Sequence, residues 1–190
     1  MNNQTINKRN FKEELTAIIA EKGGLTGAPI KLNDKLRQRL MDIYSTETEG
    51  SLATVRTDGW PQANVIDFWH VGLDLYFQTL ENAQKAVNME RDSRVSLTIT
   101  PPFNDFGEML ALSMAARAEK VTERSKIGET YHLFLERVPH MKEFAEYESD
   151  IAYPAPGMAV YRLRPELISL IDFTKGYGNM DLVKIGKDDF

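Results

Sequence analysis

The pattern of hydrophobic and polar positions changes near residue 50, and the predicted elements change with it. Before that point hydrophobic residues recur at helical spacing in two segments, residues 11–22 and the stretch after Asn33. Gly23-Gly24 ends the first helix, and Asn33 is a suitable N-cap for the second. The sequence predicts a helical extension over residues 1–50 that packs on a β-rich domain over residues 51–190, as one domain overall.

Short segments rich in β-branched and aromatic residues follow one another through the second part of the chain. Asp58-Gly59 is a strong hairpin signal between the first two segments. Strands joined by so few residues pair antiparallel, because parallel pairing needs a long crossover. We therefore predict a mainly β, α+β fold: a closed or nearly closed antiparallel barrel with flanking helices at 82–91 and 123–137. The predicted strands span 51–56, 61–69, 73–79, 94–100, 109–121, 158–163 and 167–173.

Composition narrows the function classes. The 190 residues carry a formal net charge of -5, and a mildly acidic surface repels nucleic acids and anionic lipids. The chain has no cysteine, so thiolate catalysis and cysteine-bound metals are excluded. No apolar run reaches the roughly 20 residues that span a bilayer. The polar N-terminus lacks a secretory signal, and we expect a cytoplasmic protein.

The segment from Thr79 to Lys85 suits a phosphate group. A helix N-terminus offers backbone N–H groups and a partial positive charge. Asn82 is a plausible cap, Lys85 adds a cation at about the third helical position, and Thr79 and Gln84 add neutral donors. The alternative is a solvated lysine on a short surface helix.

Several stretches, in their order and spacing, resemble the pyridoxamine 5'-phosphate oxidase-like family of flavin-binding split barrels. The similarity covers about two-thirds of the chain, from residue 51 to roughly 178. The matching stretches are DGxP at 58–61, VI at 65–66, YFQT at 76–79, NAQKA at 82–86, RVSL at 94–97, ARAEKV at 116–121 and YRLRPE at 161–166. The resemblance implies an antiparallel split barrel that binds FMN.

The resemblance also implies where the cofactor would lie. Its phosphate would meet Gln78, Thr79, Gln84 and Lys85, and its ring would lie against the strand that carries Asn64, Val65, Ile66 and Asp67. Alternation places Asn64, Ile66 and Phe68 on one face and Val65, Asp67 and Trp69 on the other. Asp67 either bonds a flavin nitrogen or points to solvent, and at least one of Val65 and Ile66 is expected to pack in the barrel.

The chain departs from the family pattern at several positions. The family usually has Ser-Arg where this chain has Ala83-Gln84, a basic residue at Asn64, and a substrate-binding lysine at Trp69. True pyridoxamine-phosphate oxidases also carry a C-terminal Trp and several Arg or His, whereas this chain has none of these after Pro165. We therefore expect a relative with different chemistry, in which Arg56 or Arg117 could replace the missing phosphate ligands.

Three functions remain open on the sequence. The first is a homodimeric FMN-dependent oxidoreductase with its sites between subunits, acting on an unidentified small molecule with NADH or NADPH as a candidate donor. The second is a non-catalytic flavin- or haem-binding module, for which His70 is a conceivable haem ligand. The third is a cofactor-free relative. A deazaflavin is an alternative to FMN, and the catalytic residues are not identified.

Two loops and the histidines complete the candidates. No two of His70, His132 and His140 have a recognised metal-ligand spacing, so no metal site is predicted. The apolar loop at 101–106 is either a lid or a dimer contact. In relatives, a Gly-rich segment like Lys175-Gly176-Tyr177-Gly178 lies near the cofactor of the neighbouring subunit, while the alternative is an ordinary turn.

Overall fold

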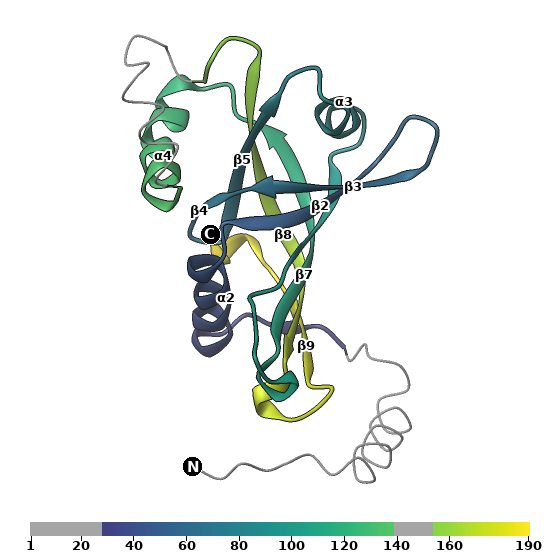
Figure 1. Cartoon of the computed structure of the whole chain (residues 1–190), viewed down its shortest axis with the longest axis vertical. Helices are drawn as coiled ribbons and strands as arrows, with labels where there is room; N and C mark the ends of the chain where they lie inside the picture. The colour runs from purple at the N-terminus through teal and green to yellow at the C-terminus, as the bar shows by residue number, and fades with distance from the viewer. Residues whose placement is uncertain (1–27, 139–153) are drawn as a thin grey trace.

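The structure is a computed structural model that describes residues 28–138 and 154–190. The predicted helix at 11–22 and His140 lie outside these residues. Figure 1 shows a long twisted sheet with α2 and α4 along one side and α3 near one end. The helices are α2 (Asp34–Thr46), α3 (Gln84–Arg91) and α4 (Arg124–Arg137), with short 3-10 turns η1 (Phe106–Glu108), η2 (Phe173–Lys175) and η3 (Lys187–Asp189).

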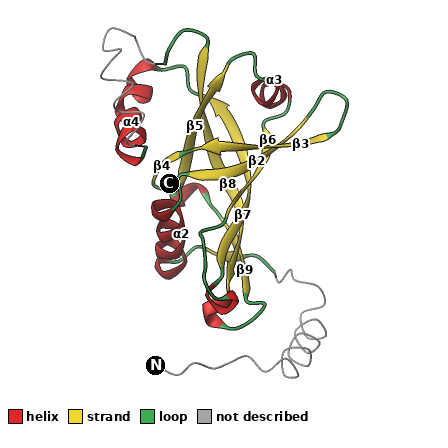
Figure 2. Ribbon diagram, in the orientation of Figure 1, coloured by secondary structure: helices red, strands yellow, loops and turns green. Residues whose placement is uncertain are grey.

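The described residues form a nine-stranded mixed sheet, which Figure 2 shows in yellow. It runs in the order β1-β9-β8-β7-β6-β2-β3, with β5 paired to β8 and β4 paired to β5. Only the β1–β9 pair is parallel among the described strands. The strands are β1 (Ile30–Lys31), β2 (Glu49–Val55), β3 (Pro61–Asp67), β4 (Trp69–Val71), β5 (Asp74–Leu80), β6 (Arg94–Ile99), β7 (Leu110–Lys120), β8 (Met158–Asp172) and β9 (Met180–Lys184).

The predicted fold class is confirmed, since the sheet is mainly antiparallel and carries flanking helices, but the barrel is not closed. The long strand β8 explains the split. One edge of β8 pairs with β7 throughout, while its other edge pairs first with β5 and then with β9. The sheet therefore diverges at the middle of β8 instead of curving back on itself.

Two predicted strands, 158–163 and 167–173, are in fact the single strand β8. The sequence places Pro165 between them, and a proline removes one ladder donor. The structure tolerates Pro165 because it lies next to a bulge in β8, where Glu166 is the extra residue opposite Ala115 and Ala116 of β7 and where β8 also changes partner. The proline therefore marks a change of partner and not a strand end.

The core has two parts, on opposite faces of β4 and β5. The larger lies inside the split barrel and includes Leu40 and Tyr44 of α2, whose N-cap Asn33 accepts from the backbone N–H of Leu36 as predicted. The smaller lies under α4 and is centred on Trp69 and Phe134. The predicted strand 61–69 breaks at Phe68, which enters the larger core while Trp69 enters the smaller. No helix in the described part of the chain is long and apolar enough to cross a membrane.

Candidate cofactor site

The helix that carries Lys85 starts two residues later than the sequence predicts. Its first residue is Gln84 and its N-cap is Ala83, which makes no side-chain capping bond, so the prediction of Asn82 as the cap is wrong. Lys85 is consequently the second helical residue. Alanine is a poor N-cap, costing about 1 kcal/mol relative to Ser, Thr, Asn or Asp. The first N–H groups of α3 are thus left without a capping side chain, which suits an anion at this helix end.

The two predicted ligands on α3 differ in how their side chains are engaged. Lys85 is half-buried, and no carboxylate pairs with it within residues 28–138 and 154–190. Gln84 donates from Nε2 to Oδ1 of Asn88, one turn along the helix, at 2.9 Å. Lys85 remains available to a phosphate, whereas one of the two amide N–H groups of Gln84 already donates to Asn88.

Strand β3 lies at the edge of the sheet in the described structure, because it pairs only with β2. The predicted alternation is confirmed for this strand. Asn64 and Ile66 face the barrel interior, half-buried and buried, whereas Val65 and Asp67 face outward. Val65 is 65% exposed, which is high for a valine in a strand. Asp67 is exposed at the C-terminal end of β3, whereas Gln62, which contacts α3, lies near the N-terminal end of the same strand.

The two residues predicted on β5 lie on opposite faces. Thr79 is buried and shares the interior face with Phe77, while Gln78 shares the face of Tyr76, which stacks on Trp69 beneath α4. The chain leaves β5 by a tight turn in which Ala83 N–H bonds the carbonyl of Leu80. Thr79 and α3 are therefore held close together in the chain, and Gln78 points to the other side of the strand.

A buried group that the sequence analysis missed joins α3 to β3. Asn88 is fully buried and donates from Nδ2 to Thr54 Oγ1 on β2 and to Gln62 Oε1 on β3. Gln62 is two residues before Asn64 and on the same face of β3. The amide pair Gln84–Asn88 at i, i+4 was a readable signal on the predicted helix. The partners of Asn88 on β2 and β3 are brought to it by the fold, so they could not be predicted from the sequence.

The outward surface of β3 continues across the sheet as an uncharged face, which we name the outer face. Strand register aligns its residues in two rows that cross β3, β2, β6, β7 and β8. Charged residues flank these rows, with Asp67 and Glu49 at one end, Arg94 and Arg117 at the other, and the exposed Lys184 of β9 beside Leu167. The rows are Val65-Ser51-Thr98-Ser113-Ser169 and Ala63-Ala53-Ser96-Ala115-Leu167.

The arginines suggested as replacement ligands already have carboxylate partners. Arg56 pairs with Asp58 in the β2–β3 hairpin at 2.6 Å. Arg117 pairs with Glu166 at 3.0 Å on the outward side of β7 and β8. Neither guanidinium bonds a residue of α3 in the described structure, although the backbone carbonyl of Arg56 accepts a hydrogen bond from Arg91 Nη2 of α3 at 2.9 Å.

His70, the conceivable haem ligand, is engaged within the chain. Its Nδ1 lies 3.2 Å from the Gly72 carbonyl oxygen, and its ring centroid lies 5.4 Å from that of Tyr44. Burial lowers the pKa of His70, the Gly72 contact opposes this shift, and the nearby Arg137 guanidinium adds to it. This environment favours the neutral imidazole.

The two loops singled out in the sequence meet in space. Phe103 and Phe106 come from the β6–β7 connection, and Phe173 and Tyr177 come from η2 and the turn after it. The rings of Phe106 and Phe173 are 5.4 Å apart at their centroids, and those of Phe173 and Tyr177 are 5.0 Å apart. Phe103 and Phe106 are exposed. The described structure thus gathers four aromatic rings from segments about 70 residues apart.

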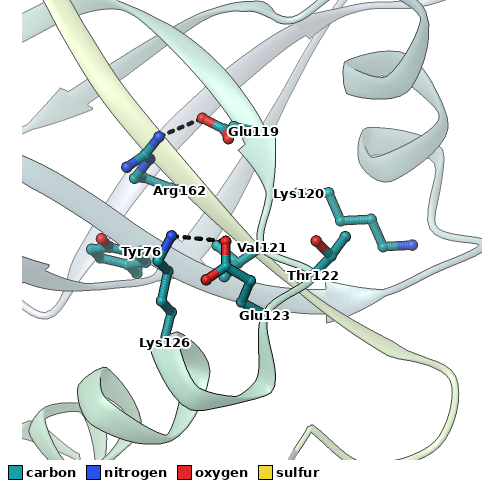
Figure 3. Close-up of a pocket in the computed structure, with 8 residues that line it drawn as sticks. All are labelled: Tyr76, Glu119, Lys120, Val121, Thr122, Glu123, Lys126 and Arg162. Carbon is teal, nitrogen blue, oxygen red and sulfur yellow. Dashed lines mark hydrogen bonds and ion pairs between the residues drawn. The ribbon is translucent and has the colours of Figure 1, made fainter.

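Figure 3 shows a pocket between β5, the end of β7 and the start of α4. Its charged side chains neutralise one another, with Arg162 paired to Glu119 and Lys126 paired to Glu123. It contains none of the eight predicted site residues, and its volume of about 80 Å³ is too small for a flavin. The predicted residues lie instead on α3, on β3 and at the end of β5, with Ile66 and Thr79 buried and Val65, Asp67 and Gln84 exposed. The described residues also contain no cluster of three or more His, Asp or Glu that could hold a metal ion.

Comparison with known proteins agrees with this architecture. The family model described as pyridoxamine 5'-phosphate oxidase matches residues 36–172. General stress protein 26 of Bacillus subtilis (strain 168) is 30% identical over 73 residues, which cover 38% of this chain and 51% of that protein. The chain therefore spans about half the length of this curated relative.

Solved structures share the fold at lower sequence identity. A heme binding protein from Mycobacterium smegmatis superposes with a TM-score of 0.65 at 21% identity, over 80% of this chain and 59% of that chain. General Stress Protein 26 from Bacillus anthracis str. Sterne gives a TM-score of 0.57 at 16% identity, over 79% of this chain and 98% of that chain. Because the family model covers well over half of the sequence, the chain belongs to the pyridoxamine 5'-phosphate oxidase family.

Proposed function

We propose that this protein is a homodimeric flavoprotein that binds FMN and transfers electrons to or from a small organic molecule. The observation that carries the proposal is the meeting of the uncapped N-terminus of α3 with the edge strand β3, held together through Asn88. One element suits a phosphate and the other suits the polar edge of a flat ring.

The residues on α3 fit a phosphate monoester. Its oxygens would accept from the first backbone N–H groups of α3, where the helix dipole favours an anion. Lys85 would supply the cation, and the buried hydroxyl of Thr79 would supply a neutral donor. Gln84 would contribute at most its second amide N–H, because the first already donates to Asn88.

The residues on β3 fit the ring. The outer edge of β3 has no strand partner in the described structure, so its N–H and C=O groups are available to bond the polar edge of the ring. Asn64 and Ile66 lie on one side of this edge and Val65 and Asp67 on the other. When bound, the flavin supplies the electron chemistry, and the protein binds it, orients it and excludes water.

The outer face supports the dimer. A solvent-facing side of an antiparallel sheet is normally polar, and this protein has 27% charged residues, yet the ten residues of these rows are five Ser or Thr and five Ala, Val or Leu, without a charge. Small side chains lose little conformational entropy when they are covered. A second copy on this face would also cover Val65 and close the open side of the β3 site.

The proposed cofactor is tested with the purified protein. We expect a flavin spectrum and a released molecule with the mass of FMN, and bleaching by NADH or NADPH under anaerobic conditions. Lys85→Ala should weaken FMN binding by about 1–3 kcal/mol, the range for a charge-assisted hydrogen bond. Lys187→Ala, which removes an exposed lysine in η3, is the matched control. Protein that neither copurifies with nor binds FMN would refute the proposal, and a haem spectrum would favour the alternative module.

The dimer is tested by sedimentation velocity. Ala115→Arg places a large charge in the middle of the outer face and should shift the protein to monomer. His132→Arg, on the exposed side of α4, should leave the dimer intact. A monomeric wild type, or a dimer that Ala115→Arg does not disturb, would show that the outer face is not the interface.

A further inference from the structure

Asn88 is the most completely bonded polar side chain in the described interior. It is 0% exposed, and its Nδ2 donates to Thr54 Oγ1 at 2.9 Å and to Gln62 Oε1 at 3.0 Å. Its Oδ1 accepts from Gln84 Nε2 at 2.9 Å. Both N–H donors of the amide and one lone pair of its oxygen are therefore used, which is what a buried amide requires.

These bonds connect the N-terminal part of α3 to β2 and β3. The C-terminal end of α3 is tied to the same hairpin separately, because Arg91 Nη2 donates to the carbonyl oxygens of Val55 and Arg56. Thr54 lies on β2, Gln62 on β3, and Gln84 is the first residue of α3. Asn88 lies one turn from Gln84, so the network fixes the N-terminal turn of the helix relative to the strand hairpin. Lys85 belongs to that same turn, and Asn64 is on the face of β3 that Gln62 occupies.

A packing contact would position the helix less strictly. The neighbouring Met89 is also buried, but an apolar side chain can shift along its neighbours at little cost. Hydrogen bonds at 2.9–3.0 Å have preferred distances and angles, and leaving one buried amide group unpaired is expensive. The network therefore specifies one placement of α3 over β3.

We propose that Asn88 is a positioning residue for the cofactor phosphate. It does not touch the phosphate. It holds the N–H groups of the first turn of α3 and Lys85 at a fixed offset from β3, so that a cofactor whose ring lies along β3 meets them with its phosphate. The same network keeps the Gln84 amide away from the phosphate. This inference rests on the proposed function.

The experiment compares FMN with riboflavin, which has the same ring and no phosphate. Dissociation constants for both are measured by fluorescence titration of the full chain, and their ratio reports the phosphate contribution. We expect the wild type to bind FMN at least tenfold more tightly than riboflavin. Asn88→Leu, which keeps similar volume, should lower this ratio at least fivefold while changing riboflavin affinity less than twofold.

Two pairs, each made of a variant and its control, separate a positioning role of Asn88 from a general loss of stability. Gln84→Ala removes the helix side of the network at an exposed residue and should lower the ratio in the same direction. Its control is Gln38→Ala, which breaks the corresponding i, i+4 amide–carboxylate bond on α2 and should leave the ratio unchanged. The control for Asn88→Leu is Met89→Ala, a buried packing variant on the same helix.

The outcomes distinguish this inference from the proposed function. A wild type that does not bind FMN refutes the proposed function and this inference with it. A wild type that prefers FMN, with Asn88→Leu preserving the ratio, refutes the positioning role alone. An equal fall of the ratio in Met89→Ala also refutes it, because any loosening of α3 would then suffice. If Asn88→Leu does not fold, the Gln84→Ala and Gln38→Ala pair decides.

Discussion

Replacing Trp69 tests whether the departure from the family pattern at this position is structural. The family's substrate-binding lysine corresponds to Trp69, but here the side chain is fully buried under α4. Its ring centroid lies 5.1 Å from that of Phe134 and 6.0 Å from that of Tyr76. Ile127 packs in the same cluster. A residue in this position cannot reach a substrate without unpacking the helix.

The expected loss of unfolding free energy follows from the area that the Trp69 side chain buries. A buried tryptophan removes about 150–250 Å² from water, which at about 25 cal/mol per Å² corresponds to ~4–6 kcal/mol. Measured Trp→Ala losses of about 3–5 kcal/mol include partial relaxation of the cavity. We therefore expect Trp69→Ala to cost ~3–5 kcal/mol of unfolding free energy. Trp69→Lys should cost at least as much, because its ammonium has no partner in this apolar cluster.

Urea denaturation followed by far-UV circular dichroism measures these losses. Trp69→Phe is the control, since it keeps an aromatic ring and removes an indole N–H that has no hydrogen-bond partner. It should cost below about 1.5 kcal/mol. A loss below about 1 kcal/mol for Trp69→Ala, or a Trp69→Lys variant as stable as the wild type, would show that the side chain is not buried as described.

Three further substitutions should change stability in a predictable direction. Burial lowers the pKa of His70 from its usual 6.5, so the unfolded chain binds a proton more readily than the folded chain, and stability should fall as pH drops below about 6.5. In urea titrations His70→Gln should reduce this pH dependence, and His132→Gln, on the exposed side of α4, should not. Gly50→Ala should destabilise by about 1–3 kcal/mol, because a Cβ there would lie 3.1 Å from both Leu97 Cδ1 and the Thr98 carbonyl oxygen. Gly128→Ala in α4 should stabilise by about 0.5–1 kcal/mol in the same assay, because a Cβ there meets nothing within 4 Å.

Local signals were sufficient for most of the fold. The helix after Asn33 follows from apolar spacing and a cap, and the helix at 123–137 follows from its apolar residues; both are confirmed. The strands at 94–99 and 110–120 follow from β-branched and small residues between turn signals. Their antiparallel pairing follows from the short connections between them.

The misses share a physical cause, which is that tertiary contacts decided the outcome. Strand β1 has two exposed residues, and its parallel pairing to β9 brings together segments about 150 residues apart. No local pattern encodes such a pair. Pro165 looked like a strand end because the bulge beside it, at Glu166 of β8, becomes visible only when the register with β7 is known.

The candidate site, like the fold, was predictable from the sequence only where local features define it. The sequence indicated the Thr79–Lys85 segment and the strand carrying Asn64, since these are local features that also match the family. The spacing of Gln84 and Asn88 permitted their bond to be predicted, but the sequence could not indicate that Asn88 also bonds β3, because the bond from Asn88 to Gln62 spans 26 positions. Nor could it indicate the outer face, because its rows depend on the register of five strands.

The absence of the family's Ser-Arg pair changes how a phosphate would be held under the proposed function. An arginine would add a full charge and a planar fork of donors that matches phosphate, whereas backbone N–H groups are neutral and act only along their own direction. With Ala83 as N-cap and Gln84 bonded to Asn88, this chain offers Lys85 and the oriented N–H groups of α3. A site that depends on oriented neutral donors depends on the placement of the helix that carries them. The fully bonded amide of Asn88 supplies that placement, so the weaker charge and the stricter positioning belong to one arrangement.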